Sequence, residues 1–221
     1  MISVYLNVLL GVCLVLLYVF HSFRVKELKR TIRTLAEHYN EKMSEVRNEL
    51  CCVEKELGID PLTGARNRRY LKENAETLFF HSVTVNHPLC ALYFDLDSFK
   101  LVNDKIGHTK GDKILVDFVD LLKNTTRSSE ADRPGDQVYR VGGDEFLVLM
   151  PEMLEKDLDS FLERLRREVY RLGERHNIPK DFQFGVSVGQ VFKKDEENFE
   201  TMLKRVDGMM RDDKSTKDRR R

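Results

Sequence analysis

The chain has 221 residues, enough for one domain of ordinary size and an additional segment. Hydrophobic residues make up 41% of it and charged residues 33%, a balance that supports a packed core. Lys plus Arg and Asp plus Glu each number 37, so the formal net charge is zero. Because a neutral chain lacks the broad positive field that attracts nucleic acid, we expect no nucleic-acid partner.

The first predicted element is a membrane anchor at residues 3–20, a stretch without a charged residue. As a helix it would be about 27 Å long, close to the ~30 Å of a bilayer core. A signal peptide is a weaker reading, because no Lys or Arg precedes the stretch and no cleavage site follows it. A buried core helix is also disfavoured, since the stretch has no polar face. The basic residues from Arg24 to Arg33 predict a single-pass inner-membrane protein with the rest of the chain in the cytoplasm.

Residues 25–57 are predicted to form one helix with an apolar seam. Its members recur every three or four residues, with one extra four-residue step that would locally unwind a coiled coil. They are Leu28, Ile32, Leu35, Tyr39, Met43, Val46, Leu50, Val53 and Leu57. The helix either lies on its own domain or pairs with a second chain. The long regular seam and the charged remaining positions favour a parallel coiled coil and hence a homodimer.

The four cysteines show no spacing typical of a metal site. They are Cys13, Cys51, Cys52 and Cys90. We expect reduced thiols. The alternative is a disulfide between chains at Cys51 or Cys52, if their helix dimerises.

A domain is predicted over residues 58–214, after Gly58 and Pro61 end the long helix. Helices are expected at 67–85, 111–125, 153–176 and 198–211. Strands are expected at 89–95, 137–141, 145–150 and 182–192. Without its flanking helices the order is β-α-β-β-α-β, which predicts an α+β fold of the palm or ferredoxin-like type, an antiparallel sheet backed by helices.

Four acidic residues are expected to meet at one edge of this sheet. In the predicted topology the first strand, ending at Asp95 and Asp97, lies antiparallel to the third, which opens at Asp144 and Glu145. Four close carboxylates would repel one another, and a divalent cation such as Mg²⁺ would resolve the repulsion. Acids that merely cap surface turns are the alternative. Their position between apolar strands favours the metal.

Gly142 and Gly143 precede two of these acids. A turn at this pair can take positive φ, and the missing side chains would let a nucleotide approach the backbone. A plain hairpin turn is the alternative, and the acids that follow directly make it less favoured.

Several ordered motifs across residues 58–214 resemble the GGDEF family. The motifs are Arg140–Phe146 (RVGGDEF), Asp60–Gly64 with Asn67–Arg69, Phe94–Lys100 with Val102–Asp104, Gly107–His108, Gly111–Asp112 and Val186–Gly189. The resemblance implies a nucleotidyl-cyclase-like fold and a diguanylate cyclase. Such an enzyme condenses two GTP into cyclic di-GMP and two pyrophosphates, by attack of a 3′-hydroxyl on an α-phosphate. It also implies Mg²⁺ or Mn²⁺, and two facing domains because each holds one GTP.

The resemblance further implies residue roles. The metal ligands would be Asp95, the Leu96 carbonyl, Asp144 and Glu145. One acid of the Asp144–Glu145 pair would help to deprotonate the attacking hydroxyl. The substrate-binding residues would be Phe99 and Lys100 beside the phosphates, Asn103 and Asp112 on guanine, Gly142 and Gly143 at the turn, and Lys214 near the triphosphate. Arg133 and Asp136 match the RxxD motif of an inhibitory cyclic di-GMP site, with a surface turn as the alternative.

The C-terminal segment departs from the family pattern, which is typically YxAKxxGRN. Lys214 is kept, but Lys217 stands in place of the glycine and Asp218 in place of the arginine. A frayed, solvated end is therefore favoured over phosphate binding by this segment, and 215–221 is read as a basic tail. The alteration leaves open a receptor that binds cyclic di-GMP without turnover. A purely structural dimerisation module would have no need of Asn103 or Asp112.

Overall fold

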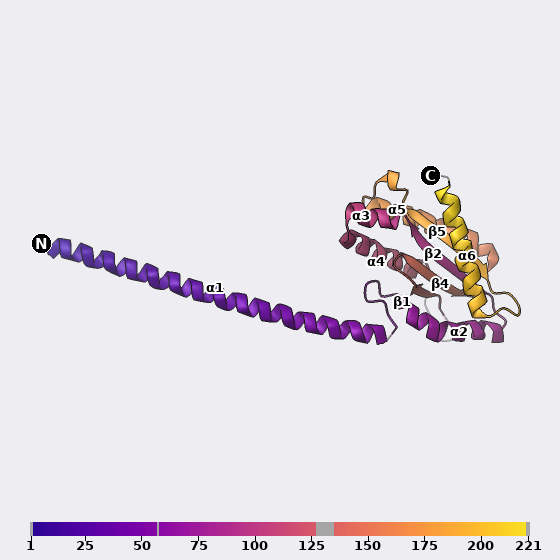
Figure 1. The fold of residues 1–221 in the computed structure, drawn as a ribbon, viewed down its shortest axis with the longest axis horizontal. Helices are drawn as coiled ribbons and strands as arrows, with labels where there is room; N and C mark the ends of the chain where they lie inside the picture. The colour runs from indigo at the N-terminus through magenta and orange to yellow at the C-terminus, as the bar shows by residue number, and fades with distance from the viewer. Residues whose placement is uncertain (1, 57, 127–134, 220–221) are drawn as a thin grey trace. The chain divides into compact units, whose positions relative to one another are not determined.

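The computed structural model describes residues 2–56, 58–126 and 135–219 (Figure 1). Within these ranges, the side chains of residues 2–16, 18–20, 51, 52, 54–56 and 218 are not described. The chain divides into two compact units, Met1–Cys52 and Val53–Arg221. Each unit is therefore considered by itself.

A single long helix, α1 (Ile2–Glu56), makes up the first unit and runs a few residues beyond it. The described side chains of the predicted seam are well exposed, from 49% for Val53 to 70% for Leu35. Leu57, the last predicted seam residue, lies outside the described residues. The helix thus carries a row of uncovered apolar side chains.

The membrane prediction is overturned by the composition of the described helices. Across the parts of the chain that the structure describes, none is both long and apolar enough to cross a bilayer. This finding contradicts the predicted single-pass inner-membrane location and the anchor at residues 3–20. Apart from Leu17, the side chains of that stretch lie outside the described residues.

A mixed five-stranded sheet forms the centre of the second unit. Its strands are β1 (Arg66–Asn67), β2 (Leu89–Asp97), β3 (Gln137–Arg140), β4 (Glu145–Pro151) and β5 (Gly185–Phe192). Their order is β1-β3-β4-β2-β5, with β1 parallel to β3 and the other neighbours antiparallel. The α+β class and the antiparallel pairing of β2 with β4 are thereby confirmed, while β1 adds a short parallel edge that the sequence did not predict.

Helices cover both faces of the sheet. One face is packed by α2 (Arg68–Thr84) and α6 (Phe199–Asp218), and the other by α3 (Phe99–Ile106), α4 (His108–Thr125) and α5 (Glu155–Arg175). A short 3₁₀ turn, Lys180–Phe182, precedes β5. Because both faces are covered, every residue of β2 is buried, which explains its continuous apolar run.

Side-chain caps fix where two of these helices begin. Asn67 accepts a hydrogen bond from the Tyr70 amide at the start of α2, and Asn198 accepts one from Thr201 at the start of α6. Cys90, inside β2, is a free and buried thiol whose pKa is raised to about 12 by burial, with a smaller contribution from Asp136. It therefore stays protonated. The side chains of Cys13, Cys51 and Cys52 lie outside the described residues.

Candidate active site

The register of β2 against β4 brings the acids of two distant segments together. Asp95 lies directly opposite Glu145, and the Leu96 amide donates a 3.3 Å hydrogen bond to the Asp144 carbonyl. Asp95 is only 5% exposed, whereas Asp144 and Glu145 are half-buried. Three of the four predicted acids, with the Leu96 backbone between two of them, therefore share one end of the sheet.

Asp97 lies two residues after Asp95 at the same end of β2, but its side chain has partners of its own. Its register partner is Gly185 in β5. The Ser187 hydroxyl donates to Asp97 Oδ1 at 2.6 Å, and Lys217 Nζ lies 3.2 Å from Oδ2. The carboxylate is buried and held by these two partners, so it is already paired within the protein.

Lys214 contacts the acid group directly, because its Nζ lies 2.7 Å from Asp95 Oδ1. Burial raises the pKa of Asp95 above its ordinary value; the Lys214 hydrogen bond and charge oppose this, and Asp144 and Glu145 add to it. Burial alone would lower the pKa of Lys214, but the hydrogen bond and the negative charge of Asp95 outweigh that effect and raise it. Lys214 is thus a protonated amine that forms an ion pair with the buried carboxylate of Asp95.

The Gly142–Gly143 turn is held by Arg140. Its Nη2 and Nε donate to the Gly143 carbonyl at 2.8 and 3.2 Å, and its Nη1 donates to Asp60 Oδ1 at 2.9 Å. The same Asp60 oxygen accepts from the amide and hydroxyl of Thr63 at 2.9 and 2.7 Å. A loop at the start of the domain therefore supports the turn that precedes the acids.

Neither glycine of this turn takes the positive φ that its sequence allowed. Close approach is the actual requirement at Gly142, where a Cβ would lie 2.7 Å from Glu145 Oε2. That oxygen also lies 3.4 Å from the Tyr93 hydroxyl. A Cβ at Gly143 would meet nothing within 4 Å, so the backbone there is open to a ligand.

The predicted guanine-binding residues lie on α3 and α4. Asn103 Oδ1 is buried and has no hydrogen-bond partner within the described residues. A Cβ on Gly111 would lie 1.8 Å from this oxygen, so any larger residue there would displace the Asn103 side chain. Asp112, the next residue, is exposed. Asn103 Oδ1 and the Asp112 carboxylate are both hydrogen-bond acceptors. They could therefore pair with a ligand that carries N–H donors.

The remaining predicted residues differ in how the structure places them. Phe99 is buried at the start of α3, and Lys100 beside it is exposed. Arg133 of the predicted inhibitory motif lies outside the described residues, and Asp136 is half-buried just before β3. The segment from Lys214 to Asp218 is helical and belongs to α6, whereas the sequence predicted that this helix ends at residue 211.

The donor atoms suit a hard divalent cation in part. Over residues 2–56, 58–126 and 135–219, no three His, Cys, Asp or Glu side chains converge as a ready-made metal site. The acid edge offers the carboxylates of Asp95, Asp144 and Glu145 and the Leu96 carbonyl. Mg²⁺ is usually held by one or two carboxylates together with substrate phosphates, so this oxygen set fits an ion that arrives with its nucleotide.

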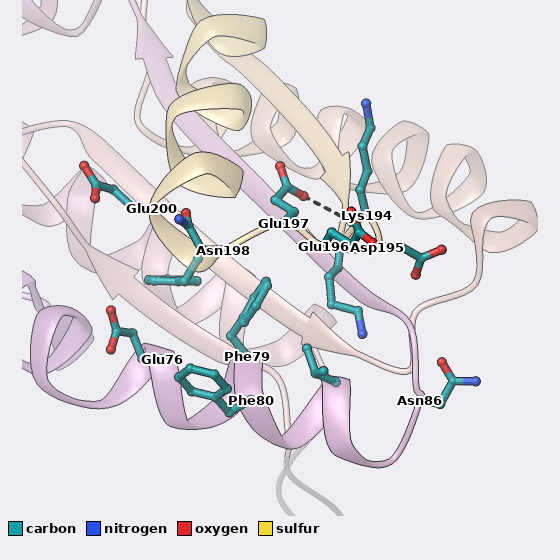
Figure 2. A pocket seen from close by; sticks show the side chains of 13 residues that line it. Glu76, Phe79, Phe80, Asn86, Lys194, Asp195, Glu196, Glu197, Asn198 and Glu200 are labelled. Atoms are coloured by element: carbon teal, nitrogen blue, oxygen red, sulfur yellow. Dashed lines mark hydrogen bonds between the residues drawn. The ribbon is translucent and has the colours of Figure 1, made fainter.

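A pocket of about 390 Å³ between α2 and the start of α6 contains none of the predicted site residues (Figure 2). Phe79 and Phe80 from α2 lie on one side of it, and acidic residues from the segment before α6 lie on the other. The Lys194 amide donates to Glu197 Oε2 at 3.1 Å there. None of the residues that line this pocket belongs to the acid edge.

The sequence did not predict the supporting roles of Arg140, Asp60, Ser187 and Lys217. Arg140, Asp60 and Ser187 stand inside motifs that the sequence singled out, so their positions were visible but their contacts were not. Lys217 was read only as a departure from a pattern. Its contact with Asp97 depends on α6 continuing past Arg211, which the sequence did not indicate.

Comparison with known proteins identifies the family to which this fold, with its acidic residues at one edge of the sheet, belongs. The family described as "Diguanylate cyclase, GGDEF domain" matches residues 57–220. The chain belongs to this family.

Individual relatives carry the same description. Diguanylate cyclase DgcP of Escherichia coli K12 is 38% identical over 133 residues, covering 60% of this chain and 37% of that protein. Diguanylate cyclase DosC of the same strain is 29% identical over 189 residues, covering 84% of this chain and 38% of that protein. The chain thus spans less than two fifths of the length of these curated relatives.

Among solved structures, the coiled coil and GGDEF domain of DgcB from Caulobacter crescentus, in complex with c-di-GMP, superposes with a TM-score of 0.62. The match covers 84% of this chain and 95% of that one at 21% identity. This likeness supports the fold.

Proposed function

We propose that the chain is a diguanylate cyclase that condenses two GTP into cyclic di-GMP and two pyrophosphates. The observation that carries the proposal is the register of Asp95 against Glu145, beside a Gly-Gly turn that Arg140 anchors. Family membership and relatives named as diguanylate cyclases support the same reaction.

Asp95, Glu145, Asp144 and the Leu96 carbonyl would hold Mg²⁺ or Mn²⁺ together with the substrate phosphates. When bound, such an ion lowers the pKa of the attacking 3′-hydroxyl and neutralises charge that develops at the α-phosphate. Glu145 or Asp144 would accept the proton of that hydroxyl. Lys214, already protonated beside Asp95, would neutralise the phosphates of the leaving group, with Phe99 and Lys100 beside them.

Guanine would be recognised by Asn103 and Asp112. The Asp112 carboxylate can accept from the N1–H and N2 amine of guanine, and Asn103 Oδ1 is a buried acceptor that lacks a donor among the described residues. Adenine presents no such pair of neighbouring donors on that edge. GTP is therefore the expected substrate rather than ATP.

Two domains must face each other, because each would hold one GTP. The exposed apolar seam of α1 supports a parallel coiled coil that pairs two chains. Pairing through α1 would raise the effective concentration of the second half-site.

A second candidate is a receptor that binds cyclic di-GMP without turnover. It is favoured by the Lys214–Asp95 pair, which occupies a proposed metal ligand, and by Asp218, which replaces the family's arginine. Arg133 and Asp136 are the residues proposed to bind cyclic di-GMP in this receptor.

Incubation of the purified chain with GTP and Mg²⁺, followed by mass spectrometry of the products, separates the two candidates. The cyclase yields cyclic di-GMP, whereas the receptor returns GTP unchanged and binds added cyclic di-GMP.

A further inference from the structure

Lys217 is one of the most heavily bonded side chains of the acid edge. Its Nζ lies 2.6 Å from the Val186 carbonyl, 3.2 Å from Ser187 Oγ, 3.2 Å from Asp97 Oδ2 and 3.1 Å from Asp213 Oδ2. An ammonium group has three protons to donate, so these oxygens occupy it fully. Lys217 is therefore not available to a phosphate group.

Two lysines of α6 meet two acids of β2 in matching register. Lys214 bonds Asp95 and Lys217 bonds Asp97. Lysines three apart lie on one face of a helix, and acids two apart lie on one face of a strand, with a spacing of about 6 Å in both cases. One pair alone would let the end of the helix pivot, whereas two pairs fix its position along the strand.

A third contact binds the same turns of α6 to the sheet. Asp213 Oδ2 accepts a 2.9 Å hydrogen bond from the Val188 amide of the edge strand β5, and it also faces Lys217. Asp97 is only 4% exposed, and its carboxylate accepts a hydrogen bond from the Ser187 hydroxyl. Lys217, whose own side chain is 30% exposed, thus connects α6, β2 and β5 through one ammonium group.

We propose that Lys217 is a positioning residue that fixes the last turns of α6, so that Lys214 Nζ stands at Asp95 and at the triphosphate. The inference deepens the proposed function and rests on it. The position occupied by glycine in the family's pattern would then carry a new anchor in this chain, at the segment where Asp218 removes an arginine.

A simpler role must be separated from this one, because Lys217 also neutralises a buried carboxylate. Removing one partner of a buried pair leaves an uncompensated charge and destabilises a protein, whereas removing both often does not. A variant that lacks the charges of both Asp97 and Lys217 therefore separates the two roles. If Lys217 only neutralises Asp97, triphosphate binding should be normal in this variant, whereas positioning predicts weaker binding.

The first measurement is the dissociation constant of 3′-deoxy-GTP and of GMP with Mg²⁺, since the deoxy analogue lacks the attacking hydroxyl. In Lys217→Met we expect binding of the triphosphate to weaken roughly tenfold, because Lys214 loses its place, while GMP binding stays within about twofold. Lys217→Arg should restore most of the loss. Lys204→Met is the matched control, since Lys204 is an exposed lysine of α6 that pairs only with Glu200 among the contacts described.

The deciding measurement uses the double variant Asp97→Asn, Lys217→Met, with thermal unfolding followed on the same samples. Positioning predicts normal stability together with weakened binding of the triphosphate. Normal binding of the triphosphate in this variant, or in Lys217→Met itself, would overturn the inference about Lys217. The proposed function would still stand in that case if the wild-type chain is active. A wild-type chain that binds neither nucleotide would overturn both.

Discussion

Glu145 is positioned by the turn before it and by Tyr93. Its Oε2 lies between the Gly142 backbone and the Tyr93 hydroxyl, 3.4 Å away. Burial, together with the charge of Glu145, raises the pKa of Tyr93 above its ordinary value, so the hydroxyl remains a donor at working pH. The carboxylate is oriented by shape and by one hydrogen bond, and both survive in an amide of the same size.

Glu145→Gln should therefore abolish turnover and leave the fold intact. The substitution removes one negative charge from the proposed metal site, which costs several kcal/mol of transition-state stabilisation, roughly a hundredfold or more in rate. Cyclic di-GMP formation and the thermal midpoint are measured on the same preparation. Glu163→Gln, an exposed acid on α5, is the control. Retained turnover in Glu145→Gln would remove the basis of the metal assignment.

Gly111→Ala tests the guanine site through packing. The new Cβ would lie 1.8 Å from Asn103 Oδ1, so Asn103 must move. We expect the KM for GTP to rise about tenfold or more, because an unpaired guanine donor costs on the order of 1–3 kcal/mol. Gly208→Ala on α6, where a Cβ meets nothing within 4 Å, is the control. An unchanged KM for GTP would show that Asn103 does not read the base.

At the scale of elements, the turn before β4 depends on a loop 80 residues earlier in the chain. Arg140 joins the Gly143 carbonyl to Asp60, and both side chains of that ion pair are less than a fifth exposed. Burial alone would raise the pKa of Asp60, but hydrogen bonds from Thr63 and Arg140 and the charge of Arg140 outweigh this effect and lower the pKa below its ordinary value.

This pair should make a pH-dependent contribution to stability. A carboxyl whose pKa is lower in the folded state stabilises the protein above its unfolded pKa, and that stability is lost as pH falls through the folded value. Asp60→Asn should thus reduce the free energy of unfolding by about 1–2 kcal/mol at neutral pH, and by less below pH ~4. Urea unfolding of both proteins at several pH values checks it. A difference that is constant with pH would contradict the ion pair.

The sequence predicted the elements with strong patterns and missed those set by distant contacts. The apolar run of β2 and the helices α2 and α6 were predicted from the sequence, with most boundaries displaced by one or two residues. The end of α6 is the exception, because the helix continues seven residues past the predicted Arg211 to Asp218. Helix α3 was missed because it is short and follows Ser98, which has φ of 60° and makes no side-chain cap. Strand β1 has two residues, too few for a pattern.

The candidate site shows the same division. Asp95, Asp144 and Glu145 follow from strand ends and topology, so their meeting was foreseeable. The hydrogen bonds of Asp97 were not foreseeable, because their partners Ser187 and Lys217 lie about 90 and 120 residues away in the chain. Side-chain pairing over such separations leaves no periodic signal in the sequence.

At the scale of the whole molecule, the central question is how two active sites meet. The seam of α1 is apolar and exposed, with Leu35 at 70% and Leu50 at 57%. Replacing both leucines with Asp should weaken the proposed dimer strongly, since each loses apolar burial worth roughly 1.5–3 kcal/mol and gains a desolvation cost. Activity per chain should fall with it.

Sedimentation and GTP turnover of the same samples check this prediction. Replacing Glu41 and Lys42, exposed charged residues of α1 outside the seam, with Gln is the control. A monomer with full activity per chain would refute the mechanism of two facing half-sites. An undiminished dimer would assign the pairing to the domain's own surface.

The most direct measurement counts pyrophosphate and cyclic di-GMP in one reaction of the purified chain with GTP and Mg²⁺. The proposed condensation predicts two pyrophosphates for each cyclic di-GMP, with no comparable product from ATP. GTP bound without release of pyrophosphate, or pyrophosphate released without the cyclic dinucleotide, would contradict it.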